Sequence, residues 1–157
     1  MSATKEIKTG ATHTTAGDFI GTWKLVDYSF LHEDGMVEKP WGDHVVGYLL
    51  YSAEGYMSGN LSPANRRHKV EQADSQPRRK RDYIAYAGPY TVEGDTVTHH
   101  VEVSLFPNWL GTAQLRYHER KGDMLTLRTP PISSGGGTVA VQLIWKKVHP
   151  NIAKLRV

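Results

Sequence analysis

The side chains most able to do chemistry in this sequence gather in one run, THHVEVSLFPNWLGTAQLR, which begins at Thr98 and ends at Arg116. Two β-patterned segments here flank a turn that contains a proline. Because side chains alternate between the two faces of a strand, Thr98, His100 and Glu102 share one face of the first segment. Gln114 and Arg116 likewise share one face of the second. If these polar rows point into a barrel, an imidazole, a carboxylate, an amide and a guanidinium meet on adjacent strands.

These residue types suit acid–base chemistry without a metal. An imidazole titrates near neutrality and serves as a general acid or base, so His100 is the candidate proton carrier. Arg116 is the candidate charge stabiliser for a carboxylate, a phenolate or a developing enolate. The alternative is an internal network in which Glu102 pairs with Arg116 and fixes the strand register without chemistry. Both interpretations stay open on sequence grounds.

Aromatic residues suggest the kind of molecule that such a cavity holds. Tyr51, Tyr86 and Tyr90 fall in β-patterned segments and can line a cavity for a flat ring. In the turn before the second polar segment, the indole of Trp109 has no strand to pack under unless it folds over one end of a barrel. Together with Arg116, these rings favour an aromatic or polyketide-like acid or phenol. The predicted ligand-binding residues are Tyr51, Tyr86, Tyr90, Glu102, Asn108, Trp109 and Gln114.

Metal chemistry and nucleophilic catalysis find little support. His99 and His100 are neighbours on a strand and point to opposite faces, so they cannot chelate one ion. The other histidines lack ligand spacing, the chain has no cysteine, and there is no GxSxG motif. We therefore expect neither a metal site nor a cofactor.

Composition limits the class of protein. At 157 residues, of which 39% are hydrophobic, the chain fits one domain with a modest core. No apolar run approaches the roughly 18 residues of a membrane-spanning helix. The first residues lack the apolar centre of a signal peptide, and with no cysteine the expected location is the cytoplasm.

Short β-patterned segments recur along the chain and are separated by glycine-containing turns. Alternating antiparallel segments with no βαβ spacing favour a meander, and a meander of eight strands closes well into a barrel. We predict an all-β, eight-stranded antiparallel up-and-down barrel, with a short helical turn after Asp18 and an irregular connection at about 63–82. The expected strands cover residues 23–30, 47–51, 56–61, 82–92, 96–104, 112–120, 124–129 and 138–148.

The irregular connection contains a basic run from Arg78 to Arg81. Clustered cations can bind nucleic acid or an anionic membrane by releasing counterions. No recognition helix, zinc spacing or aromatic platform accompanies the run, so we interpret it as a solvated loop and expect neither partner.

Several segments resemble a known family. The opening Gly21-Thr22-Trp23 is similar to the glycine-x-tryptophan signature of lipocalins, and GYLLYSAEGYMS, the polar hairpin and the closing LIW resemble the small bacterial and fungal lipocalin-like domain family. The resemblance covers about residues 18–147. It implies a calycin-type barrel with one closed end, plugged by Trp23, and one open mouth. The expected organisation is a flexible arm at 1–17, a barrel domain at 18–148 and a tail at 149–157.

Two functions follow, because lipocalin-like barrels include both binding proteins and cofactor-free enzymes of secondary metabolism. The first is an enzyme, of isomerase, cyclase or lyase type, that acts on a hydrophobic cyclic or aromatic metabolite through His100 and Arg116. The second is a carrier or sequestering protein for such a compound. The expected partner is this small ligand, and a homo-oligomer stays open.

Overall fold

The structure is a computed structural model, and it describes residues 14–66 and 82–150. Two 3-10 turns, η1 (Ala16–Asp18) and η3 (Pro107–Trp109), interrupt a chain that otherwise forms β-strands and their connections. The strands are β1 (Gly21–His32), β2 (Val37–Glu38), β3 (Val45–Tyr51), β4 (Tyr56–Pro63), β5 (Ile84–Glu93), β6 (Thr96–His100), β7 (Val103–Ser104), β8 (Ala113–Lys121), β9 (Met124–Arg128), β10 (Ile132–Ser134) and β11 (Gly137–Lys147).

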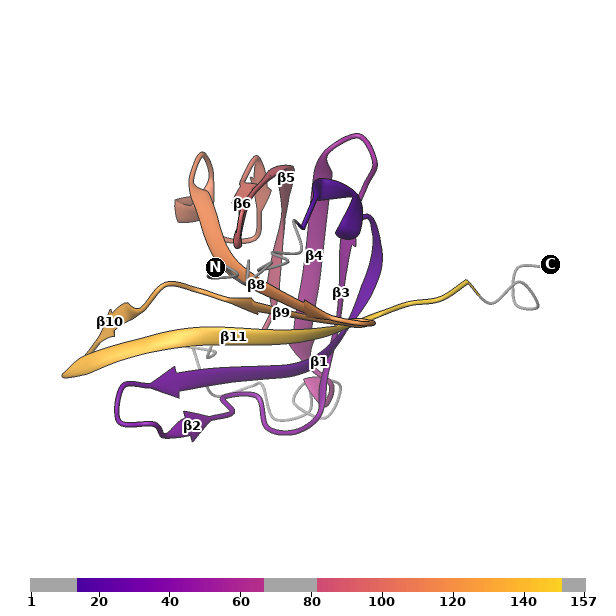
Figure 1. Cartoon of the computed structure of the whole chain (residues 1–157). Helices are drawn as coiled ribbons and strands as arrows, with labels where there is room; N and C mark the ends of the chain where they lie inside the picture. The colour runs from indigo at the N-terminus through magenta and orange to yellow at the C-terminus, as the bar shows by residue number, and fades with distance from the viewer. Residues whose placement is uncertain (1–13, 67–81, 151–157) are drawn as a thin grey trace, which may run out of the picture.

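Eight of these strands form a closed antiparallel barrel. Their order is β11-β9-β8-β6-β5-β4-β3-β1, and β1 pairs back onto β11 from Trp23 opposite Lys147 to His32 opposite Val139. Figure 1 shows β1 bending away from β3 to run along β11, where the ring closes. β2, β7 and β10 are short additions to this ring. The predicted all-β, eight-stranded up-and-down barrel is confirmed.

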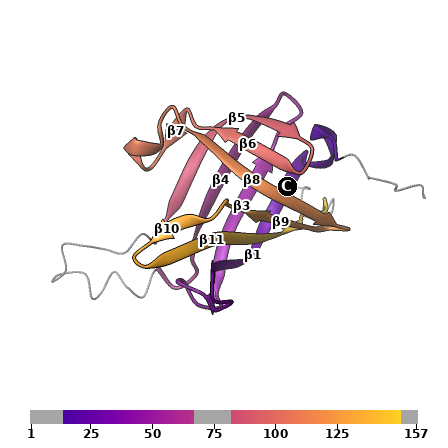
Figure 2. The same cartoon turned by 60° about the vertical axis from the view of Figure 1, so that its left-hand side comes forward.

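Tight glycine turns set the order of the strands. Gly94 and Gly122 each have φ of 57° and lie first in the two-residue turns β5–β6 and β8–β9. A glycine adopts this left-handed backbone without the steric cost that a Cβ adds, and this position is typical of type II′ hairpins. These turns hold neighbouring segments of the sequence side by side in the barrel (Figure 2).

Trp23 is fully buried beside η1, as the lipocalin-like opening implies. Its Nε1–H donates a 2.8 Å hydrogen bond to the carbonyl oxygen of Phe19, so its one polar atom is satisfied. The Arg120 guanidinium and the Lys147 ammonium lie 5.6 and 4.8 Å from its ring centre. These two cations cover the indole with favourable cation–π contacts.

The strand that carries the predicted polar row is not continuous. Tyr90 pairs with His99 and Ala87 pairs with Val103, so β5 advances by three residues where the opposite strand advances by four. The extra residue makes a β-bulge that separates β6 from β7. Gly88 faces this bulge, and an added Cβ there would collide with the carbonyl oxygen of His100. The bulge therefore depends on a position without a side chain.

Some predictions fall outside the described residues. They concern most of the 1–17 arm, most of the 149–157 tail and the basic run 78–81, so the domain boundaries stay predictions. Among the described residues, no helix is long and apolar enough to span a membrane.

Replacing Gly88 with alanine should destabilise the barrel by about 2–3 kcal/mol, the upper part of the usual range for overpacking, because the new methyl group would overlap the His100 backbone carbonyl. The matched control is Gly59→Ala, whose Cβ would lie 3.6 Å from a Leu49 methyl group in ordinary contact. The control should change stability by less than about 1 kcal/mol in urea unfolding. Equal stability of the two variants would contradict the close approach at Gly88.

Candidate ligand-binding cavity

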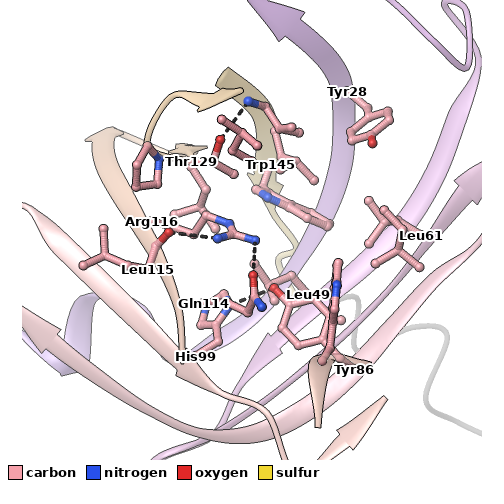
Figure 3. A pocket seen from close by; sticks show the side chains of 18 of the residues that line it. Tyr28, Leu49, Leu61, Tyr86, His99, Gln114, Leu115, Arg116, Thr129 and Trp145 are labelled. Atoms are coloured by element: carbon pink, nitrogen blue, oxygen red, sulfur yellow. Dashed lines mark hydrogen bonds between the residues drawn. The ribbon is translucent and has the colours of Figure 1, made fainter. Parts of the chain in front are cut away.

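The barrel encloses a cavity of about 650 Å³, within the range of small-molecule sites. Its walls are mostly apolar side chains from strands around the whole ring, and the connections between strands contribute Pro40, Trp41 and Trp109. Figure 3 shows the side chains converging on the space. The lining consists of Tyr28, Phe30, Pro40, Trp41, Leu49, Gly59, Leu61, Ile84, Tyr86, His99, Trp109, Ala113, Gln114, Leu115, Arg116, Leu127, Thr129, Pro130, Ile132, Val141, Leu143 and Trp145.

Aromatic rings give the cavity two flat surfaces. Trp41, in the β2–β3 connection, lies over Tyr28 with ring centres 4.3 Å apart and planes at 33°. Trp109, in η3, meets the edge of Tyr86 at 5.4 Å and 77°. The predicted placement of Trp109 over one end of the barrel agrees with this contact. A flat aromatic ligand can pack against both ring pairs.

The imidazole that faces the cavity is that of His99. Directly paired residues of antiparallel strands share a face, and β6 pairs with β8 as His99 with Gln114 and Val97 with Arg116. His99 is 1% exposed and lines the cavity. The inward row of β6 is therefore Val97 and His99, followed by the buried Val101.

The prediction that His100 faces the cavity is wrong. His100 is exposed, lies outside the lining and shares a 3.1 Å hydrogen bond with the Thr91 hydroxyl. The prediction places His100 on the inward face with Gln114 and Arg116, but His99 is the residue that pairs with Gln114, and neighbouring residues of a strand point to opposite faces. The β6–β8 connection contains the bulge, β7 and η3, so no short turn fixes this register.

The other predicted residues divide into three groups. Tyr86, Trp109, Gln114 and Arg116 line the cavity as predicted. Tyr51 and Tyr90 are buried next to it rather than in its lining, and the Tyr90 hydroxyl donates to the Ser52 carbonyl oxygen at 3.1 Å. The prediction that Glu102 and Asn108 face the ligand is wrong, because both are exposed outside the lining. Glu102 follows the buried Val101 and so points to the same outer side as His100, and Asn108 is an exposed residue of η3.

Arg116 brings a positive charge into the cavity without a carboxylate partner. Its guanidinium donates to the Leu115 carbonyl oxygen at 2.8 Å and to the Gln114 amide oxygen at 3.4 Å. In the described part of the chain it forms no salt bridge, and no aspartate or glutamate lines the cavity. The predicted Glu102–Arg116 pair is therefore not formed. Arg116 is half-buried, and its guanidinium can donate to an anionic or strongly polar oxygen in the cavity.

His99 is held between two tyrosine hydroxyls. Its Nε2 lies 2.7 Å from the Tyr51 hydroxyl and its Nδ1 lies 2.8 Å from the Tyr86 hydroxyl. Burial, with smaller contributions from Arg116 and His100, lowers the pKa of His99 to about 3. Burial also raises the pKa of both tyrosines, strongly for Tyr51. All three groups are therefore uncharged at neutral pH.

Trp145 adds a donor that the sequence pattern does not indicate. Its indole is 2% exposed and lines the cavity, and its Nε1–H has no hydrogen-bond partner among the described residues. Buried polar groups are nearly always paired, so such a donor marks a place for a ligand or water oxygen. The closing LIW motif indicates the strand, but only the closed ring shows which way the indole points.

A sequence signal for His99 did exist, because it belongs to the apolar row Val97, His99 and Val101, which predicts the buried face. On β8 the same rule fails. There the polar side chains Gln114 and Arg116 face inward, while Leu115 and Tyr117 are 36% and 46% exposed. The two strands together give conflicting signals, so the pattern alone does not reveal the polar site.

Eight antiparallel strands closed around a cavity of this size make the protein a β-barrel of the kind that has room for one small ligand. The chain belongs to the lipocalin-like domain family, whose sequence model matches residues 20–148. The predicted family resemblance is confirmed.

One curated protein and two solved structures are similar to this chain. The 4'-hydroxy-3'-methoxypropiophenone carrier protein ppsC of Aspergillus oryzae is 42% identical over 77 residues, which cover 43% of this chain and 69% of that protein. A lipocalin-like protein from Bacteroides uniformis is 16% identical, with a TM-score of 0.46 over 84% of this chain and 100% of the other. An uncharacterized protein from Bacteroides eggerthii is 14% identical, with a TM-score of 0.44 over 83% and 100%.

The low pKa of His99 predicts an acid-sensitive fold. Folded His99 binds a proton only near pH 3, whereas in the unfolded chain it does so near its ordinary pKa of 6.5. The unfolded state therefore binds more protons between these values. The contribution of His99 to stability is complete above about pH 6.5 and is lost as the pH falls, at about 1.4 kcal/mol per pH unit.

Urea unfolding at pH 7 and pH 5 measures this slope. His99→Gln, which cannot titrate, should lose this share of the pH dependence, whereas the exposed control His44→Gln should keep it. Identical slopes for the wild type and His99→Gln would mean that His99 is not held neutral by burial.

Proposed function

We propose that this protein binds and carries a small aromatic compound that presents an electron-rich oxygen to the barrel interior. The observation that carries the proposal is the Arg116 guanidinium, which lies in a mostly apolar cavity without a carboxylate partner among the described residues. A carboxylate, phenolate or ketone oxygen on the ligand would satisfy this cation.

The rest of the lining favours the same class of ligand. The ring pairs Tyr28–Trp41 and Tyr86–Trp109 offer flat apolar surfaces. The indole N–H of Trp145 is a second donor without a protein acceptor among the described residues. A ligand with a ring to pack and an oxygen to accept hydrogen bonds matches both features.

The fungal relative supports this choice by its name. The compound in that name, 4'-hydroxy-3'-methoxypropiophenone, is an aromatic ketone with a phenol and a methoxy group. Its benzene ring carries a hydroxyl, a methoxy and a propanoyl group, so it offers the flat ring and the acceptor oxygens that this proposal requires. We therefore take this compound as the first probe for the present protein.

A carrier role is favoured over catalysis by the placement of the titratable groups. An isomerase, cyclase or lyase of the predicted type needs a proton carrier at the ligand, and His100 lies on the outer face. The inward imidazole, His99, has a strongly lowered pKa and hydrogen bonds at both nitrogens, which makes it a weak general base. The described lining offers no carboxylate in its place.

Arg116→Met should weaken binding of 4'-hydroxy-3'-methoxypropiophenone by about 10- to 150-fold, because it removes a charge-assisted hydrogen bond while keeping most of the bulk. Isothermal titration calorimetry measures the change. Arg128→Met is the matched control, because Arg128 is exposed on neighbouring β9 and lies outside the lining. Binding that is equally strong in both variants would remove Arg116 from the site.

Prolonged incubation of the same compound with a molar equivalent of protein should return it unchanged in chromatography with mass detection. Formation of a product would instead support the enzyme interpretation. In that case His99→Gln should lower the rate by about 10²- to 10⁴-fold, the usual contribution of one general acid or base. Product formation that is insensitive to His99 would place the chemistry elsewhere.

A further inference from the structure

The three groups Tyr51, His99 and Tyr86 form a chain of hydrogen bonds that runs from the closed core to the cavity. Tyr51 lies at its buried end and is 2% exposed, with the rings of Phe19 and Tyr90 packed edge-on at 5.3 and 4.8 Å. Tyr86 lies at the other end and lines the cavity. Figure 3 shows His99 joined to Tyr86 beside the Gln114 and Arg116 side chains.

A neutral imidazole has one N–H donor and one acceptor nitrogen, so the chain has two possible directions. In the first, Tyr51 donates to Nε2 and Nδ1–H donates to the Tyr86 oxygen. In the second, Tyr86 donates to Nδ1 and Nε2–H donates to the Tyr51 oxygen. The two directions place the free hydroxyl proton at opposite ends of the chain.

Burial distinguishes the two directions. Within the described residues, His99 Nε2 is the hydrogen-bond partner of the Tyr51 hydroxyl, and no second acceptor lies within reach. The second direction would leave the Tyr51 proton unpaired in a sealed core, which is costly. The first leaves the Tyr86 proton free at the cavity, where a ligand or water oxygen can accept it. The first direction is therefore the stable one.

We infer that Tyr51 and His99 are positioning residues that fix Tyr86 as a hydrogen-bond donor to the ligand. The site then selects compounds with an acceptor oxygen, such as a ketone or phenolate, next to Tyr86, and gains nothing from a compound without one. This inference rests on the proposed function, because it assigns the ligand to the same cavity. Tyr86 becomes a specificity-determining contact in addition to Arg116.

The direction can be measured without any ligand. Nitrogen-15 NMR of the whole chain distinguishes protonated from unprotonated ring nitrogens, and the signal missing in His99→Gln identifies His99 among the eight histidines. We expect the tautomer with the proton on Nδ1. A proton on Nε2 would overturn the inference and leave the proposed function untouched.

A pair of probes tests the selectivity. Acetophenone and ethylbenzene have the same carbon skeleton and differ at the carbonyl oxygen, and quenching of tryptophan fluorescence reports occupancy because Trp41, Trp109 and Trp145 line the cavity. In the wild type the ketone should bind more tightly. Tyr86→Phe should reduce this preference by ~3- to 10-fold, the value of one neutral hydrogen bond, while ethylbenzene affinity changes little.

Two further variants distinguish the loss of Tyr86 positioning from a general loss of core packing. Tyr51→Phe removes the donor that selects the tautomer, so both His99 tautomers should appear and the ketone preference should fall. Tyr90→Phe is the matched control, because Tyr90 bonds to the Ser52 carbonyl outside the lining and should leave the preference intact. An unchanged preference in Tyr86→Phe would overturn the inference, whereas failure of both probes and of 4'-hydroxy-3'-methoxypropiophenone to bind the wild type would overturn the proposed function.

Discussion

Pairing of β1 with β11 is the constraint on which the rest of the structure depends. It joins the first strand of the domain to the last, from Trp23 opposite Lys147 to His32 opposite Val139, and so removes both edges of the sheet. An open sheet of the same strands would enclose nothing. Once the ring is closed, every strand has one face toward a shared interior, and each side chain lies either inside or outside.

Polar groups inside such a ring either form hydrogen bonds with one another or keep hydrogen-bonding capacity that a ligand or water could use. Tyr51, His99 and Tyr86 pair, and burial keeps all three uncharged near neutrality. Arg116 and the Trp145 indole N–H find no acidic or acceptor side chain in the described interior that would satisfy them fully. Donors thus dominate the polar chemistry of the described cavity, and this is the physical basis for proposing a ligand with an oxygen-bearing ring.

One position without a side chain connects the backbone to the site. Because Gly88 allows close approach of His100, β6 ends in a bulge. After the bulge, the chain pairs once more with β5 as β7 and then forms η3. Trp109 in η3 packs against Tyr86. Glu102 faces outward for a separate reason: it belongs to the same row as the exposed His100, while Val101 between them is buried. The bulge therefore shapes the aromatic surface of the cavity, whereas the alternation of β6 leaves Arg116 without its predicted partner.

The sequence by itself determined the eight strands, their glycine turns, the buried Trp23 and the family, because these depend on local alternation and on residues with special backbone freedom. It also identified Tyr86, Trp109, Gln114 and Arg116 as cavity residues. That His99 rather than His100 faces inward follows from the assembled sheet. Alternation has a period of two and cannot say which row is inside; that depends on how β6 pairs with its neighbours, where His99 lies opposite Tyr90 and Gln114.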